Sequence, residues 1–228
     1  MPLDWDTYYE REAELTDFTP ENDPNEIQRC LAAFSVFPRD RSLHVLDVGC
    51  GDGYFCYWLK GKRRDVSVQG MDISGPRLCR ARSKYTNIKF HEGALPNLPI
   101  QGEFYDLVSC IEVLEHMEEP LTCIKELERI SKKYVLITVP DREVLRDILC
   151  PCCLAKFPES GHINSFDEIK VHKLLKKANL QIISSKIYYP PLGATTGRIP
   201  QRLGKLLRKI YNFIDPRPGS YIAILAKK

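Results

Sequence analysis

The sequence predicts an α/β domain: a mostly parallel sheet with helices on both of its faces. From residue 43 to 141, apolar strand-like runs alternate with amphipathic helical segments, which requires parallel strands joined by helical crossovers. The first run ends in Asp47 and continues into a loop with three alternating glycines. A strand, a tight glycine turn and a helix in this order form the opening unit of a nucleotide-binding sheet.

Length and composition fit a single domain spanning residues 1–228. The chain is 28% charged and 43% hydrophobic, and its net charge is only +3. No apolar run approaches the roughly 18 residues that span a bilayer. Because the acidic N-terminus lacks a signal-peptide core, we expect a cytoplasmic location. The nine cysteines are mostly scattered through apolar stretches, which predicts reduced, buried thiols.

Residues 1–25 form an acidic N-terminal arm in which Trp5, Tyr8 and Tyr9 lie close together. Two interpretations stay open. The arm is either a mobile lid over a cofactor pocket, with its rings facing a positively charged ligand, or a segment packed on the domain. Apolar residues at helical spacing then predict that residues 25–37 form a helix covering one face of the sheet.

The glycine loop in His44–Phe55 indicates which ligand is bound. A dinucleotide site uses G-x-G-x-x-G, whereas here the third glycine comes one residue early and Tyr54 holds its place. Asp47 and Asp52 would repel a diphosphate, but they suit a ligand that carries an ammonium and a sulfonium group. The backbone amides are left for its carboxylate. S-adenosyl-L-methionine is such a ligand.

The later segments extend the same pattern. Strands are predicted at 66–72, 87–91, 104–111, 134–139, 181–188 and 221–226, and helices at 76–85, 120–131 and 165–179. Asp72 ends the second strand, 19 residues beyond Gly53. Nucleotide folds place a carboxylate on the ribose hydroxyls at about this interval, ~20 residues.

The D-x-G-x-G-x-G loop and the strands around it resemble the class I S-adenosylmethionine-dependent methyltransferases. The resemblance has specific motifs over residues 43–141 and rests on topology elsewhere. It implies a Rossmann-like seven-stranded sheet of order 3-2-1-4-5-7-6, with the last strand antiparallel. It places the cofactor among these residues: Asp47, Gly49, Cys50 and Gly51 at the methionine moiety, Asp72 at the ribose, Ile73, Ala94 and Leu95 at the adenine, and Ile111 at the sulfonium.

Residues Glu112, Glu115 and His116 follow the fourth strand and carry the candidate chemistry. If this stretch turns helically, they share a face at the carboxyl edge of the sheet, where open α/β sheets bind ligands. Three interpretations compete: His116 as a general base for a hydroxyl acceptor, with Glu112 beside it; a divalent-metal site completed by His162; or a helix cap with a structural histidine. The metal pattern resembles ubiquinone-biosynthesis O-methyltransferases and small-RNA 2′-O-methyltransferases.

The segment 142–164 is an insertion that contains cysteines. Cys150 and Cys153 have the C-x-x-C spacing of a zinc half-site, and His162 is a possible third ligand. A single C-x-x-C without its partner pair is a weak signal, so packed or exposed thiols are the competing interpretation. The two metal hypotheses compete for His162.

The segment 190–219 is a second, basic insertion with apolar residues at helical spacing. It predicts an amphipathic helix that either packs on the domain or lies on an anionic membrane through residues 198–214. Nucleic acid is not expected as a partner, because no RNA-binding module is recognisable and the net charge is modest. The sequence carries no signal for an oligomeric state.

We therefore expect a methyltransferase that acts on the oxygen of a small or lipid-like acceptor. The family often has an acidic residue where this chain has Ala94, so backbone contacts and apolar packing must recognise the adenine. That departure favours one alternative, a methyltransferase-like binding or assembly protein that has lost catalysis. An RNA 2′-O-methyltransferase is the other alternative.

Overall fold

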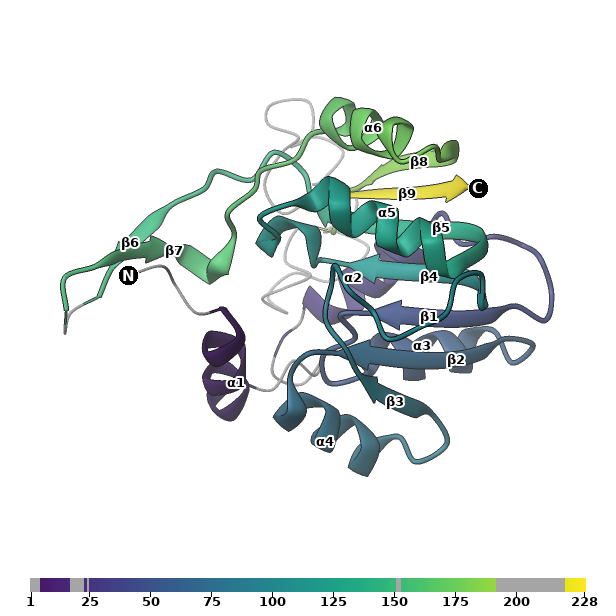
Figure 1. Cartoon of the computed structure of the whole chain (residues 1–228), viewed down its shortest axis with the longest axis horizontal. Coiled ribbons are helices and arrows are strands. Elements are labelled where there is room, and N and C mark those ends of the chain that lie inside the picture. The colour runs from purple at the N-terminus through teal and green to yellow at the C-terminus, as the bar shows by residue number, and fades with distance from the viewer. Residues whose placement is uncertain (1–4, 17–22, 24, 151–152, 192–219) are drawn as a thin grey trace.

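The structure is a computed structural model that describes residues 5–16, 23, 25–150, 153–191 and 220–228. Its centre is a seven-stranded sheet of order β3-β2-β1-β4-β5-β9-β8 (Figure 1). The strands are β1 (His44–Val48), β2 (Ser67–Asp72), β3 (Lys89–Glu92), β4 (Tyr105–Ile111), β5 (Ser131–Pro140), β8 (Gln181–Tyr188) and β9 (Tyr221–Lys227). The final strand, β9, is antiparallel to both β5 and β8, and the other pairings are parallel. The predicted fold and strand order are confirmed.

Two layers of helices cover the sheet. On one face lie α2 (Asn25–Phe34), α3 (Tyr54–Lys62) and α4 (Gly75–Lys84), which share a hydrophobic core with the sheet. On the other face, α5 (Pro120–Ile130) and α6 (Glu168–Lys177) share a second core (Figure 1). The central strands are apolar on both sides because both sides are covered. Most of the described cysteines are buried, as expected, while Cys79 and Cys153 are exposed.

One helix begins later than the sequence predicts. The predicted helix 165–179 starts at Glu168, because the Asp167 carboxylate caps it by accepting a hydrogen bond of 2.7 Å from the Lys170 N–H. The residues before the cap are held elsewhere: Asn164 Nδ2 donates to the Met117 carbonyl and Ser165 Oγ to the Glu143 carbonyl. The Asn164 contact ties the end of the first insertion to the loop after β4, and the Ser165 contact ties it to the start of the same insertion.

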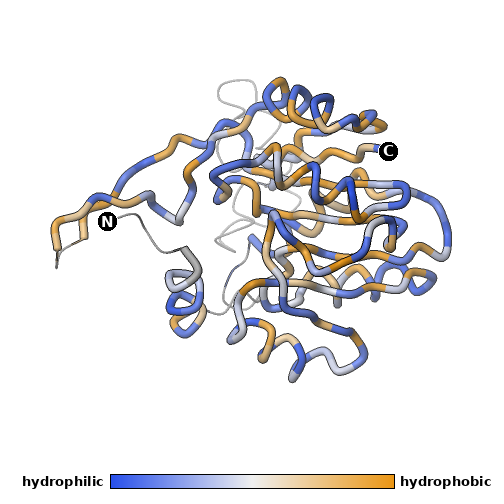
Figure 2. The backbone as a smooth tube through the Cα atoms, in the orientation of Figure 1, coloured by the Kyte–Doolittle hydropathy of each residue, from blue (hydrophilic) through white to orange (hydrophobic). Residues whose placement is uncertain are grey.

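That insertion forms a hairpin that the sequence did not predict. β6 (Asp147–Leu149) pairs antiparallel with β7 (Lys156–Pro158), followed by the 3₁₀ turn η2 (Glu159–Gly161). Figure 1 shows the hairpin projecting from the sheet, and Figure 2 shows apolar residues near its end. Leu149 and Leu154 are 56% and 69% exposed.

The second insertion lies outside the described residues from 192 to 219. The amphipathic helix and the membrane contact through 198–214 therefore stay predictions. Within the described parts of the chain, no helix has both the length and the apolar character needed to cross a membrane.

Candidate functional site

A cavity of about 840 Å³ opens at the carboxyl ends of the parallel strands β1, β2 and β4. All the residues predicted for the cofactor and for the metal site after the fourth strand line it: Asp47, Gly49, Cys50, Gly51, Asp72, Ile73, Ala94, Leu95, Ile111, Glu112, Glu115, His116 and His162. The topology therefore gathers residues from five separate segments around one space. Their individual roles stay predictions.

The glycine loop is shaped by contacts that exclude side chains. Gly49 has φ +77°, and a Cβ on it would lie 2.3 Å from Val113 Cγ2. Gly53 has φ +78°, and its Cβ would lie 2.6 Å from Phe90 Cζ. Only glycine readily adopts a positive φ and also leaves room for a neighbouring side chain so close to its Cα. The N–H groups of Gly49 and Cys50 donate to the Met71 carbonyl, at 2.8 and 3.0 Å, and so fix the turn onto β2.

Asp47 and Asp72 are both buried at this loop. Asp47 is 2% exposed and accepts a hydrogen bond of 2.7 Å from Ser109 Oγ. Burial raises the pKa of Asp47 to about 7. Asp72 accepts hydrogen bonds from the N–H groups of Gly51 and Ser74, at 2.7 and 2.9 Å. Each Asp72 oxygen keeps lone pairs for a ligand hydroxyl, because a carboxylate has about four acceptor sites.

Asp52 departs from the sequence expectation. Its carboxylate pairs with two arginines of α4: Arg77 Nη1 lies 2.9 Å from Oδ2 and Arg80 Nε lies 2.7 Å from Oδ1. The idea that Asp52 attracts the ammonium of the ligand is therefore wrong, because two guanidinium groups already neutralise it. Asp47 is left as the buried acid of the loop with no cationic partner within the described residues.

The same arginines hold the N-terminal helix α1 (Trp5–Leu15) beside the cavity. Arg77 pairs with Glu12, and Arg80 donates to the carbonyls of Ala13 and Thr16, at 2.7 and 3.1 Å. Tyr8, Tyr9 and Glu12 consequently line the cavity. Within the described residues, the interpretation of the arm as a packed segment fits better than an unattached lid.

Arg29 is a cavity residue that the sequence analysis missed. It lies on α2, where its Nη1 is 2.5 Å from Glu26 Oε1 and 3.1 Å from Asp23 Oδ2. Its buried Nε has no hydrogen-bond partner within the described residues. Nothing in the helical spacing of residues 25–37 distinguished this arginine from a solvated one.

Glu112, Glu115 and His116 do not lie together on one helical turn, although the sequence suggested it. Only Leu114–His116 turn, as the 3₁₀ helix η1. Glu112 has φ +53° and is tied to β5, because its N–H donates to the Thr138 carbonyl and its carboxyl accepts from Thr138 Oγ1 at 2.9 Å. Glu112 lines the same cavity but does not share a helical face with the other two.

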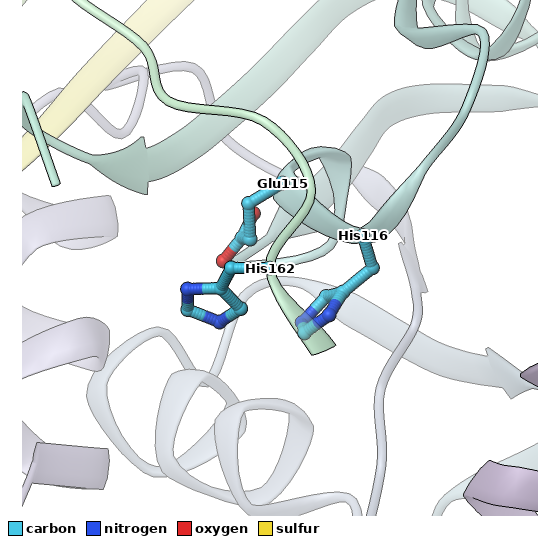
Figure 3. Close-up of side chains that lie close together, drawn as sticks. All are labelled: Glu115, His116 and His162. Atoms are coloured by element: carbon cyan, nitrogen blue, oxygen red, sulfur yellow. The ribbon is translucent and has the colours of Figure 1, made fainter. Parts of the chain in front are cut away.

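Glu115, His116 and His162, which all line this cavity, lie close together (Figure 3). One ligand atom from each lies within 4.8 Å of the others. The two imidazole centroids are 4.6 Å apart, and the Tyr9 ring meets His116 edge-on at 5.6 Å. His162 is fixed by the residues that follow it, since the N–H groups of Ile163 and Asn164 both donate to the Glu115 carbonyl at 2.9 Å.

The electrostatics of this cluster are unusual. Glu115 is fully buried, and neither of its carboxyl oxygens has a hydrogen-bond partner in the described parts of the chain. Burial, with Glu112 nearby, raises the pKa of Glu115 well above its usual range, and burial raises that of Glu112 to about 7. Burial also lowers the pKa of His116 to about 4. A cation between these groups would compensate the buried carboxyls.

Among the described residues, no group of zinc ligands gathers at Cys150 or Cys153. Cys150 is half-buried and Cys153 is exposed, and neither joins a group of three possible metal ligands among the described residues. His162 lies with Glu115 and His116 instead. Between the two competing assignments of His162, the geometry supports the acidic cluster.

Comparison with known proteins agrees with this architecture. The profile of a family described as "Methyltransferase domain" matches residues 20–185. The ajmaline N-methyltransferase of Rauvolfia serpentina is 28% identical over 116 residues, which are 48% of this chain and 40% of that protein. The malonyl-[acyl-carrier protein] O-methyltransferase of Pectobacterium atrosepticum is 30% identical over 125 residues, 54% of this chain and 44% of that protein. The chain thus spans less than half the length of these curated relatives.

A solved structure shows the same fold. Magnesium protoporphyrin IX methyltransferase from Synechocystis PCC 6803, with bound SAH, superposes with a TM-score of 0.57 at 17% identity, over 90% of this chain and 81% of that one. The family profile covers more than half of the sequence, including the glycine loop and the strands that build the cavity. The chain therefore belongs to the methyltransferase domain family.

Proposed function

We propose that this chain is an S-adenosyl-L-methionine-dependent methyltransferase that transfers the methyl group to an oxygen of a small or lipid-like acceptor, with a divalent ion at Glu115, His116 and His162. The observation that supports the acceptor chemistry most is the fully buried Glu115 carboxyl, which lies close to two imidazoles in the cavity of the glycine loop. Such a group favours catalysis over the alternative of a binding protein.

The cofactor end of the cavity suits a zwitterionic sulfonium ligand. Asp47 offers a buried carboxyl to the positive charge, and Asp72 offers acceptor oxygens to the ribose hydroxyls. Arg29, with its unpaired Nε, is the residue we assign to the carboxylate of the ligand. Ile73, Ala94 and Leu95 supply the apolar wall for the adenine.

The acceptor end fits an ion better than a histidine base. An imidazole whose pKa is lowered to about 4 takes a proton from a hydroxyl poorly. The same neutral imidazole is the form that binds metals. Both oxygens of Glu115 lack partners within the described residues and are available as ligand atoms. Glu112, held by Thr138 at 2.9 Å, is the nearby acid assigned to receive the acceptor proton.

The donor set indicates which ions are suitable. Two imidazole nitrogens with one carboxylate suit first-row transition ions such as Mn²⁺, Fe²⁺, Co²⁺ or Zn²⁺. Mg²⁺ and Ca²⁺ prefer oxygen donors throughout. When bound, the ion would lower the pKa of an acceptor hydroxyl, and S-adenosyl-L-methionine supplies the electrophilic methyl group. The protein residues hold the acceptor oxygen in line and keep water out.

Binding measurements test the cofactor assignment. Calorimetry with S-adenosyl-L-methionine should show weaker binding for Asp72→Ala, about tenfold or more, because a ribose hydrogen bond is lost. Glu92→Gln is the matched control, since Glu92 ends the neighbouring strand β3 and is exposed. Equal affinities for wild type and Asp72→Ala would contradict the ribose assignment.

Turnover measurements test the acceptor class. Purified without a histidine tag, the protein should transfer labelled methyl groups to some member of a panel of hydroxylated acceptors, with Mn²⁺ increasing the rate. The Glu115→Ala and His116→Ala variants should lose that increase. His172→Ala is the control, because His172 lies at the α6–β8 contact with Ser185. Transfer to amines only would overturn the oxygen assignment.

A further inference from the structure

The two histidines of the cluster use the same nitrogen for anchoring. His116 Nδ1 lies 3.2 Å from the Gly161 carbonyl oxygen, and His162 Nδ1 lies 2.5 Å from Glu143 Oε2. A carbonyl oxygen only accepts hydrogen bonds, so Nδ1 of His116 carries the proton. Nε2 of His116 then keeps its lone pair, which is the form that a metal ligand needs.

The second histidine depends on Glu143 for the same state. A carboxylate that accepts the Nδ1 proton of His162 leaves Nε2 with its lone pair. Without that acceptor, no other hydrogen bond to the His162 ring within the described residues selects between the two tautomers. The ring would then spend part of its time with Nε2 protonated and unable to bind a cation.

Glu143 is itself held in place by the backbone. Its carbonyl accepts a hydrogen bond of 2.7 Å from Ser165 Oγ, and the neighbouring Arg142 N–H donates to the Phe166 carbonyl at 2.6 Å. The start and the end of the insertion 142–164 are thereby joined at its base. The Glu143 side chain is 36% exposed and does not line the cavity, so it reaches the site through His162.

We propose that Glu143 is a positioning residue of the cluster: it keeps the proton of His162 on Nδ1 and so presents the Nε2 lone pair to an ion shared with Glu115 and His116. The inference rests on the proposed metal site and does not depend on which acceptor is methylated. It also gives the insertion a function at its base, separate from the cysteines and the apolar hairpin farther along.

Two variants and a control separate this role from a structural one. Glu143→Ala removes the acceptor, whereas Glu143→Gln retains an amide oxygen that can still accept the proton. Glu159→Gln is the control, because Glu159 is an exposed acid of the same insertion. The first readout is the ¹⁵N spectrum of the histidine-labelled, metal-free protein, which distinguishes the tautomers. The second is calorimetry with Mn²⁺, which thiols bind poorly.

The expected results are specific. In the wild type and in Glu159→Gln, His162 should be the Nδ1–H tautomer, and in Glu143→Ala it should become a mixture. The affinity for Mn²⁺ should fall 10- to 100-fold in Glu143→Ala, the usual cost of losing a residue that orients a metal ligand. In Glu143→Gln part of this affinity should return. S-adenosyl-L-methionine affinity should stay unchanged, which shows that the variant is folded.

Other outcomes overturn the inference. An unchanged His162 tautomer in Glu143→Ala, or an unchanged Mn²⁺ affinity, would refute the positioning role. If the wild type itself bound no Mn²⁺, the metal site would fail. The tautomer of His162 in Glu143→Ala would then decide separately whether Glu143 orients the ring.

Discussion

At the scale of single residues, burial decides what each acid can do. Asp47 and Asp52 stand five positions apart at one glycine loop, yet Asp52 is neutralised by Arg77 and Arg80, while within the described residues Asp47 accepts hydrogen bonds from uncharged donors, Ser109 Oγ and Cys56 Sγ. Glu115 is buried like Asp47, and neither of its carboxyl oxygens has a hydrogen-bond partner in the described residues. Two acids are therefore kept in a state that is costly for folding but useful to a cationic ligand.

Asp47 should make stability depend on pH. Its folded pKa of about 7 lies above the ordinary value of 3.8, so the folded protein binds the extra proton between about pH 4 and 7. The stability of the folded state is therefore highest, as far as Asp47 is concerned, below about pH 4, where this carboxyl is protonated in both states. That stability is lost as the pH rises through 7, where the buried carboxyl must ionise. At pH 8 the Asp47→Asn variant, measured without ligand, should be more stable than the wild type, because its amide carries no buried charge. At about 1.4 kcal/mol per pKa unit, the difference in the free energy of unfolding is up to about 4 kcal/mol.

Urea unfolding at pH 4 and pH 8 measures this difference. The two proteins should have similar stability at pH 4, and Asp47→Asn should bind S-adenosyl-L-methionine more weakly at either pH. A stability difference that is the same at pH 4 and pH 8 would show that the Asp47 carboxyl does not titrate in this window.

Gly49 should tolerate no side chain. A Cβ there would overlap the Val113 side chain at 2.3 Å, and the backbone is in the left-handed region. Gly49→Ala should lose about 1–3 kcal/mol of stability through strain and overpacking, together with cofactor binding. Thermal unfolding and calorimetry check this against Gly61→Ala, because nothing lies within 4 Å of a Cβ at Gly61.

At the scale of elements, α1 connects the two ends of the cavity. It is fixed to the glycine loop through Arg77, Arg80 and Asp52, and it places Tyr9 against His116. Arg80 also satisfies carbonyls at the C-terminal end of this helix, which have no partner within the helix itself. The helix α1 is thus attached to α4, and its place beside the cavity depends on Arg77 and Arg80.

Arg80→Ala should loosen α1 without unfolding the domain. The variant loses one ion pair and two hydrogen bonds to the Ala13 and Thr16 carbonyls. Hydrogen exchange of the α1 amides should accelerate about tenfold or more, and S-adenosyl-L-methionine affinity should fall, while the exchange of β4 stays unchanged. Arg11→Ala is the control, since Arg11 is exposed and its ion pair with Glu14 lies within α1 itself. Unchanged α1 exchange would show that the helix is held by other contacts.

At the scale of the whole molecule, the sheet order brings distant segments to one edge. β1 lies between β2 and β4, so Asp47, one residue before the end of β1, lies at the same edge as Asp72 and Ile111, which end β2 and β4. The insertion 142–164 then returns over this edge and supplies His162. A ligand in the cavity touches all of these segments and should stabilise them together.

S-adenosyl-L-homocysteine should therefore raise the stability of the whole domain. At a concentration 100 times its Kd, the free energy of unfolding should increase by about 2.7 kcal/mol, because the ligand binds the folded state alone. Thermal scans of the wild type and Asp72→Ala at the same ligand concentration measure this. An equal shift in Tm for the two proteins would contradict a binding site at Asp72.

The sequence by itself determined the sheet and the identity of the loop. The alternation of strands and helices, the glycine turn and the spacing from Gly53 to Asp72 follow from local patterns, because hydrophobic periodicity and positive φ at glycine act over a few residues, whereas the strand order came from the family resemblance. The candidate residues Glu115, His116 and His162 were also identified, since two of them directly follow the fourth strand and the Glu-x-x-Glu-His pattern resembles that of metal-assisted methyltransferases.

Only the tertiary structure decided how these groups are used. The pairing of Asp52 with two arginines, the cavity position of Arg29, the strand-bound Glu112 and the contact from Glu143 to His162 all join residues far apart in the chain. Burial and charge pairing depend on those distant neighbours. No local pattern contains them, and they determine which acid attracts a ligand and which nitrogen is free to bind it.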